Sequence, residues 1–196
     1  MKRLGGLFRR FHYNSPVILT MTFLSLLVLV IQELVGNYLT LLMFSVYRSS
    51  PLDIFAYFRI FGHVLGHQGW EHFTNNFLLI LLIGPMLEEK YGSQNMLYMI
   101  TATALVTGLV SIIFFKNIIL LGASGVVFML ILLGSFVNFQ KGRIPLTFVL
   151  VVAAYLGVEV ARGLFIEKSI TQLIHIIGGI CGGLFGFKLT AGKEQG

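Results

Sequence analysis

The chain has 196 residues, of which 56% are hydrophobic and only 11% are charged. A soluble domain is about 25% charged, so the composition excludes an ordinary soluble protein, and it also excludes coiled-coil, collagen and disordered chains. Fourteen bases against eight acids give a net charge of +6. A basic chain can bind nucleic acid through a polar face, but this chain has little polar face. The bases are better explained as marks of the cytoplasmic side of a membrane protein, and we expect no nucleic-acid partner.

Six segments are apolar over roughly the 20 residues that a membrane-spanning helix needs. They cover residues 16–35, 70–87, 94–115, 118–139, 144–161 and 169–190, with a tight turn expected at Lys116 and Asn117. We therefore predict an all-α membrane protein in which residues 16–190 form a six-helix bundle. Residues 1–15 would form a basic cytoplasmic N-terminus, and residues 191–196 a cytoplasmic tail.

The bases also predict the orientation of the helices, because cytoplasmic loops carry an excess of Lys and Arg. With the N-terminus inside, nine bases lie on the inner side and five on the outer side. The inner bases are Lys2, Arg3, Arg9, Arg10, Lys90, Lys141, Arg143, Lys188 and Lys193, and the outer ones are Arg48, Arg59, Lys116, Arg162 and Lys168. Both termini are therefore expected inside, as an even number of spans requires.

The first outer segment, residues 36–69, is too long for a hairpin between helices. It is also too aromatic for a solvated loop, since it holds Tyr38, Phe44, Tyr47, Phe55, Tyr57, Phe58 and Phe61. We expect this segment to lie partly in the bilayer, at its interface with water.

Polar side chains are expensive inside a membrane and therefore indicate function. Ser124 lies eight residues after Lys116, and His175 lies seven after Lys168. At a rise of about 1.5 Å per residue, both would sit roughly 10 Å below the outer boundary. His72 and Asn76, near the start of the second span, are expected at a comparable or shallower depth.

These residue types suit acyl-transfer chemistry. A serine needs a base before it can act as a nucleophile, and the tetrahedral intermediate needs hydrogen-bond donors for its oxyanion. Ser124 and His175 supply the first pair, and His72 and Asn76, four apart on one helix face, supply donors. Each feature also has a purely structural interpretation. A serine in an apolar helix usually bonds a carbonyl, a lone histidine can serve only as a hydrogen-bonding group, and a glycine stripe usually means close helix packing.

At these residues, over positions 58–187, the sequence resembles the rhomboid family of intramembrane serine proteases. The run Gly122-Ala123-Ser124-Gly125 resembles the nucleophile motif of that family, and His175 with Gly178 and Gly182 resembles its catalytic histidine with packing glycines. Four further features lie before this motif, and all six come in the family's order along the chain. Arg59 resembles the arginine of a Trp-Arg pair, and His67 resembles the histidine that precedes the oxyanion pair, which His72 and Asn76 resemble. Gly84 to Glu88 with Gly92-Ser93 resembles the end of the second span.

The resemblance implies a six-helix fold with an extended first loop. It implies a Ser124–His175 dyad that needs no third carboxylate, metal or cofactor and cleaves transmembrane segments of membrane proteins near their outer end. The protein would lie in the cell membrane, with its site open to the extracytoplasmic side. Two residues depart from the family pattern: Phe58 stands where Trp is usual, and Phe128 where a Tyr often stacks on the histidine.

Two other functions stay open. A non-catalytic rhomboid-like protein binds membrane clients without cutting them, but such proteins usually lack the serine or histidine that this chain retains. A metal-dependent membrane protein could use the four residues His63, His67, His72 and His175, although a His-Glu-x-x-His motif is missing and Cys181 is the single cysteine. The oligomeric state also stays open, because the glycine stripe suits packing within one bundle or between copies.

Overall fold

The computed structural model describes residues 12–136 and 170–191, together with residues 146–147, 149–150 and 153–154. The expected fifth span, 144–161, therefore lies mostly outside the described residues. The described elements, in chain order, are α2 (Pro16–Val35), α3 (Tyr38–Met43), α4 (Ile54–Gly62), the 3₁₀ turn η1 (His63–Leu65), α5 (Trp70–Tyr91), α6 (Ser93–Phe114), α7 (Ser124–Ser135) and α9 (Ile170–Ala191).

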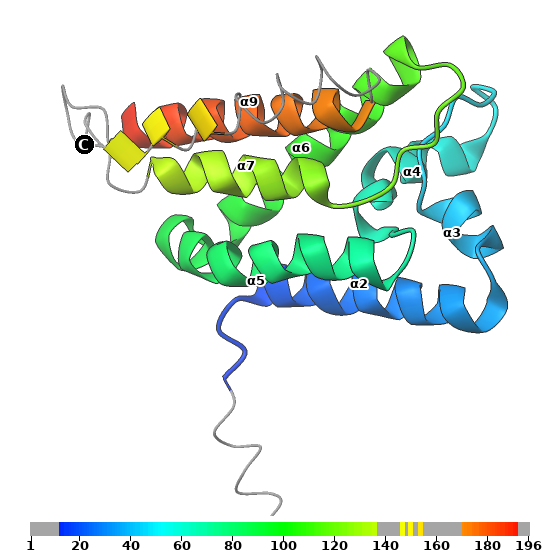
Figure 1. Ribbon diagram of the computed structural model, residues 1–196, viewed down its shortest axis with the longest axis horizontal. Coiled ribbons are helices and arrows are strands. Elements are labelled where there is room, and N and C mark those ends of the chain that lie inside the picture. The colour runs from blue at the N-terminus through cyan, green and yellow to red at the C-terminus, as the bar shows by residue number, and fades with distance from the viewer. Residues whose placement is uncertain (1–11, 137–145, 148, 151–152, 155–169, 192–196) are drawn as a thin grey trace, which may run out of the picture.

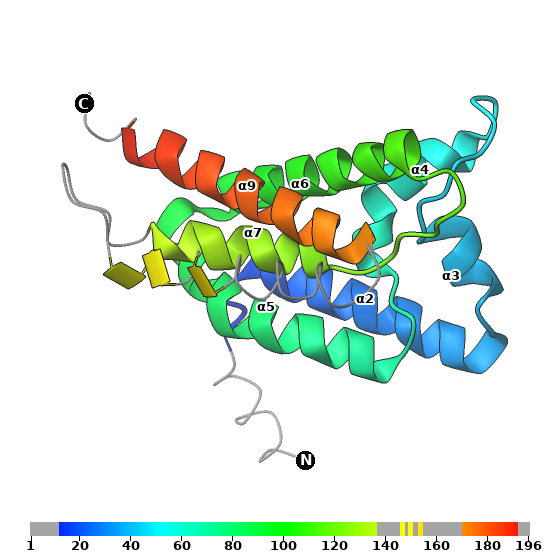
Figure 2. The same ribbon diagram turned by 45° about the horizontal axis from the view of Figure 1, so that its top comes forward.

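The long helices pack side by side, and the short ones gather at one end. Helix α7 packs against both α5 and α9, α2 packs against α5, and α6 packs against α9 and α4. Helices α5, α7 and α9 all begin at the end of the bundle where α3 and α4 lie (Figure 1). The view in Figure 2 brings α6 out beside α9. Polar residues near the N-termini of three helices are thereby collected at one end of the molecule.

Three of the described helices are long and apolar enough to cross a membrane: Pro16–Val35, Ser93–Phe114 and Ile170–Leu189. They match the expected first, third and sixth spans. The expected second span is helix α5, which continues beyond the expected end at residue 87 to Tyr91. It stops at Gly92, whose positive φ of 83° departs from the helical conformation and favours glycine.

The expected fourth span is wrong at its start, because helix α7 begins at Ser124 and not at residue 118. The turn at Lys116 and Asn117 is present, but the chain after it is extended. Val46 and Leu120 form an isolated antiparallel bridge, with N···O distances of 2.7 and 2.8 Å. Ser124 is therefore positioned by an extended strand tied to the outer segment, and not by eight residues of helix below Lys116.

The outer segment is fixed from within by Arg59, whose side chain is 1% exposed. Its guanidinium donates to the Leu42 carbonyl and to the side chains of Ser49 and Asp53, and it lies over the ring of Tyr47. This guanidinium lowers the pKa of the Asp53 carboxyl, which also accepts from the Phe55 N–H at the start of α4. The buried Arg59 side chain therefore joins the residues of the outer segment on either side of Val46, which pairs with Leu120.

Most aromatic side chains of this segment point outward. Tyr38, Phe55, Tyr57, Phe58 and Phe61 are all exposed. Aromatic rings are enriched where a protein meets the headgroup region of a bilayer, so their exposure suits the expected interfacial position.

The N-terminus of α2 is capped by a carboxylate from another helix. Glu88, near the end of α5, is 2% exposed and accepts hydrogen bonds from the backbone N–H groups of Val17 and Ile18, each at 3.0 Å. The Ser93 hydroxyl donates to the same carboxylate at 2.7 Å. Because the first N–H groups of a helix have no partner within it, Glu88 satisfies donors that would otherwise be buried unpaired. A negative charge also suits the positive end of the helix dipole.

Replacing Glu88 by alanine should lower the free energy of unfolding by about 2–4 kcal/mol, because it leaves the N–H groups of Val17 and Ile18 without a hydrogen-bond partner. Denaturant titration of the purified protein in detergent micelles measures this. The matched control is Glu89→Ala, which removes the neighbouring carboxylate from an exposed position. Equal stability of the two variants would contradict the capping role.

Candidate active site

Helices α7 and α9 approach so closely that their backbones touch. A Cβ atom added at Gly178 would fall on the Gly125 carbonyl oxygen, and one added at Gly182 would fall on the Met129 carbonyl oxygen. The two glycines are four residues apart, as are the two carbonyls, so both contacts lie on one face of each helix. The structural interpretation of this glycine stripe as close helix packing is therefore confirmed for Gly178 and Gly182.

This close approach brings the ring of His175 onto the ring of Phe128. The ring centroids are 4.2 Å apart and the planes are inclined by 37°. His175 is buried, and its neighbour Ile174 packs against Gly125. Phe128 therefore provides an aromatic surface against the imidazole of His175.

Ser124 is the first residue of α7 and lies one turn before Phe128, on the same face. The first helical hydrogen bond runs from the Val127 N–H to the Ala123 carbonyl at 2.9 Å. The N–H groups of residues 124–126 consequently precede the helical bonding pattern, and Ala123 has no side chain that could cap them. Backbone N–H groups at a helix start attract negative charge. Ser124 thus lies where a helix dipole can stabilise an anion.

The ring of His72 covers Gly122. A Cβ atom at Gly122 would lie 2.6 Å from Cε1 and 2.7 Å from Nε2 of His72, and Gly122 has a φ of 121°. Both the backbone conformation and the contact therefore require glycine. Within the described part of the chain, the buried Nδ1 of His72 has no hydrogen-bond partner. The residue predicted as an oxyanion donor therefore lies against Gly122, which precedes Ser124 by two residues.

Two other histidines bind the loop before Ser124. The His63 carbonyl accepts from the Gly122 N–H at 2.9 Å, and Nε2 of His67 accepts from the Ala123 N–H at 3.4 Å. A backbone N–H can only donate, so Nε2 of His67 carries no proton. The proton is then on Nδ1, which faces the Leu65 carbonyl at 3.3 Å. His67 therefore acts as a neutral acceptor that fixes the residue before Ser124.

Burial, helped by the nearby His72, lowers the pKa of His67 to about 3. The side chain is only 1% exposed, so its charged form is strongly disfavoured. His67 stays neutral at physiological pH, as its acceptor role requires.

Asn76 and Arg59 are placed differently from the groups above. Asn76 is buried one turn after His72, and its amide donates to the His72 carbonyl at 3.1 Å. It shares the expected helix face, with one N–H of the amide engaged in its own helix. Arg59 is part of the outer segment and supports it as described above.

Comparison with known proteins identifies the family of the chain. The sequence profile of the rhomboid domain matches residues 55–192. The chain belongs to the rhomboid family. This rhomboid is 33% identical over 139 residues to RHOMBOID-like protein 4 of Arabidopsis thaliana, a match covering 66% of the chain and 33% of the relative. It is 29% identical over 142 residues to Rhomboid-related protein 2 of Mus musculus, covering 66% of the chain and 47% of the relative. The match thus spans less than half the length of either relative.

Family membership and apolar helices together indicate a membrane protein with several spans. In the part of this rhomboid that the structure describes, no group of three or more His, Cys, Asp and Glu side chains could hold a metal ion. His67 and His72 lie with their rings 5.0 Å apart, and His67 is occupied by backbone partners.

The sequence did not reveal three features that support the site of this rhomboid. The Val46–Leu120 bridge, the His63 carbonyl and the Glu88 cap all act through backbone groups, which leave no residue pattern. Of these three features, only the Glu88 cap could have been found from the sequence, because Glu88 is an acidic residue at the end of an apolar helix and lies five residues before Ser93.

The low pKa of His67 predicts a loss of stability in mild acid. An unfolded histidine gains a proton below about pH 6.5, whereas folded His67 does so only near pH 3. Stability is therefore full above pH 6.5 and falls as the pH drops, by about 2 kcal/mol at pH 5 from this residue. Thermal or denaturant unfolding at pH 7 and pH 5 measures the difference.

The variant His67→Gln keeps an acceptor but cannot take the proton, so its stability should fall less between the two pH values. His12→Gln is the control, because that histidine lies outside the site and is exposed. An unchanged pH dependence in His67→Gln would show that His67 is not held neutral.

Proposed function

We propose that this rhomboid is an intramembrane serine endopeptidase that cuts transmembrane segments of other membrane proteins. Ser124 is the nucleophile and His175 the general base. The observation that carries the proposal is the contact between the His175 and Phe128 rings, because the imidazole thereby lies against a residue one helical turn after Ser124. A nucleophile and base held in this way can work without a third carboxylate orienting the base.

The reaction follows from these roles. His175 accepts the proton of the Ser124 hydroxyl as its oxygen attacks the carbonyl carbon of the substrate. The protonated imidazole then gives that proton to the leaving amine, and an acyl ester remains on Ser124. Water, deprotonated by His175, hydrolyses the ester and restores the serine. No metal or cofactor takes part in the proposed reaction.

The oxyanion formed in each step would be stabilised by the Ser124 N–H, the His72 ring and the Asn76 amide. The Ser124 N–H lies at the positive end of the α7 dipole. The His72 ring lies on Gly122, and Asn76 has one amide N–H beyond the bond to the His72 carbonyl. Donors aimed at a developing negative charge supply a large part of catalysis in acyl transfer.

Water must reach this site. A hollow of about 470 Å³ lies at the start of α5 and is lined by Gln68, Gly69, Trp70, Glu71, His72 and Asn75. Its polar lining and its contact with His72 support a route for water from the outer side of the membrane. The proposed orientation has six spans with both termini in the cytoplasm, so the hollow would face the extracytoplasmic side of the cell membrane.

The substrate would be a helix that unwinds near its outer end. A peptide bond inside a helix is shielded by its own hydrogen bonds, and unwinding within lipid exposes backbone groups that lipid cannot satisfy. Entry to the polar region around Ser124 and His72 would satisfy those groups.

Cleavage of a single-span model substrate in proteoliposomes tests the proposal. Ser124→Ala and His175→Ala should each remove activity, and the double variant should be no worse than either, because nucleophile and base act as a unit. A phosphonate probe that reacts with activated serines should label the wild type but not Ser124→Ala. Ser135→Ala is the matched control, since Ser135 lies at the other end of α7 and bonds the Ile131 carbonyl.

Substantial turnover by Ser124→Ala would contradict the serine mechanism. A wild type that binds membrane proteins but shows neither cleavage nor labelling would instead indicate the non-catalytic, client-binding function.

A further inference from the structure

A basic hollow lies at the end of the bundle where α3 and α4 gather, between α3 and the turn that follows α6. Its volume is about 560 Å³. Arg48 and Lys116 line it together with two tyrosines, Asn117 and four Leu and Ile side chains, and no acidic side chain is among its lining residues. Pockets of about 300–1,000 Å³ hold small molecules, so the hollow is large enough for a ligand.

The two cations of the hollow come from distant parts of the chain. Arg48 belongs to the outer segment, Lys116 belongs to the turn after α6, and the Val46–Leu120 bridge holds these two parts side by side. Both cations are exposed, and the ion pair found among the described residues joins Arg59 to Asp53 instead. Two positive charges at one hollow, without an acid beside them, attract an anionic group.

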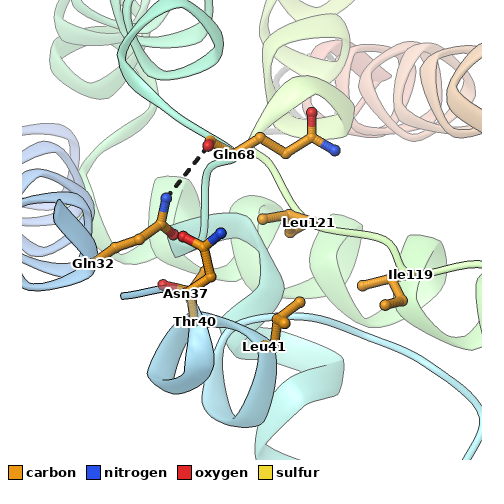
Figure 3. Close-up of a pocket in the computed structure, with 7 residues that line it drawn as sticks. All are labelled: Gln32, Asn37, Thr40, Leu41, Gln68, Ile119 and Leu121. Carbon is orange, nitrogen blue, oxygen red and sulfur yellow. Dashed lines mark hydrogen bonds between the residues drawn. The ribbon is translucent and has the colours of Figure 1, made fainter. Parts of the chain in front are cut away.

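The hollow also has an apolar surface. Leu41, Ile118 and Ile119 all line it and are exposed. Leu41 from α3 and Ile119 from the extended strand also border a neighbouring cavity (Figure 3). A free inorganic anion would leave these side chains uncovered, whereas hydrocarbon attached to the anion would cover them. The lining therefore suits a ligand that is anionic at one end and apolar at the other.

The position of the hollow in the membrane favours the same kind of ligand. Helix α6, which is long and apolar enough to cross a membrane, ends at Phe114, two residues before Lys116. A membrane-crossing α6 therefore places the hollow close to the level of the lipid headgroups. The exposed ring of Tyr38 lines the hollow, and tyrosine is enriched at that level. Phospholipids present phosphate and hydrocarbon together at this depth.

We propose that this hollow binds an anionic phospholipid, with the phosphate at Arg48 and Lys116 and the beginning of the hydrocarbon chains on Leu41, Ile118 and Ile119. The lipid would join the outer segment to the chain that leads to Ser124, next to the backbone bridge that already connects them. The binding goes beyond the proposed protease function and does not depend on it, because none of these residues belongs to the proposed catalytic groups.

Native mass spectrometry of the protein purified in a neutral detergent tests this site. Phosphatidylglycerol and phosphatidylcholine with identical chains are titrated separately, and the ratio of lipid-bound to lipid-free protein gives the Kd of the first lipid. A base near an anionic lipid surface contributes roughly a fivefold gain in affinity, and the choline group would bring a third cation to the hollow. Phosphatidylglycerol should therefore bind at least about tenfold more tightly. Equal affinities would overturn the proposal.

Charge removal at the hollow should abolish this preference. The double variant Arg48→Gln with Lys116→Gln should bind the two lipids with similar affinity, because both cations are lost. The matched control is Lys90→Gln with Lys188→Gln, which removes the same charge near the ends of α5 and α9, away from the hollow. The control should keep at least a tenfold preference. An equal loss in both double variants would show that the preference follows net charge, and would overturn the site.

Inorganic phosphate distinguishes a phospholipid from a free anion at this hollow. Phosphate at the same concentration as phosphatidylglycerol should displace little of the lipid, because it cannot cover the apolar lining. Displacement of most of the lipid would assign the hollow to a soluble anion and overturn the lipid site. Phosphonate labelling of Ser124 on the same samples reports separately on the protease function. Absent labelling with a retained phosphatidylglycerol preference would contradict that function and leave the lipid site standing.

Discussion

The backbone contact between α7 and α9 is the constraint on which the site depends. Gly178 and Gly182 allow the α7 carbonyls at Gly125 and Met129 to touch α9, and any Cβ at either glycine would separate the helices. At this separation the Phe128 ring lies 4.2 Å from the ring of His175. Two residues about 50 positions apart in sequence are therefore brought together by atoms that neither of them contributes.

A second constraint acts on the other side of Ser124. The loop before Ser124, residues 118–123, is held by backbone hydrogen bonds to Leu120 and Gly122 and by the His67 ring at Ala123. Val46 and His63, which make the first two of these bonds, belong to the outer segment that Arg59 joins together. The outer segment thus positions the loop before Ser124, in addition to its expected place at the membrane surface. It sets the place where α7 begins.

The histidines of this region divide into two kinds. His63 and His67 are buried, fixed by backbone partners and held neutral, as their lowered pKa values of about 4 and about 3 indicate. His72 and His175 contact the glycine before Ser124 and the phenylalanine after it. In the proposed mechanism only the second pair takes part in the chemistry, and the first pair positions the loop.

Much of this could be predicted from the sequence, because apolar length and the spacing of polar residues are visible there. The helical class, three of the membrane-crossing helices, the family and the meeting of Phe128 with His175 all follow from such patterns. The start of α7 could not be predicted, since residues 118–123 are as apolar as a helix and only the bonds to Val46 and His63 make them extended. The Glu88 cap was hidden for a similar reason, because its partners are backbone N–H groups of a distant helix. The depth expected for Ser124 assumed a continuous helix after Lys116, whereas the residues just before Ser124 are extended.

The rate of phosphonate labelling at Ser124 in Gly178→Ala tests most directly whether the close contact of α7 and α9 creates the site. The control is Gly183→Ala on the same helix, where an added Cβ meets no atom within 4 Å. Folded protein is quantified for each variant, so that labelling is expressed per folded molecule. A displacement of about 1 Å between serine and histidine can lower reactivity about 100-fold, so Gly178→Ala should label at least that much more slowly while Gly183→Ala labels like the wild type. Folded Gly178→Ala that labels at the wild-type rate would contradict the account.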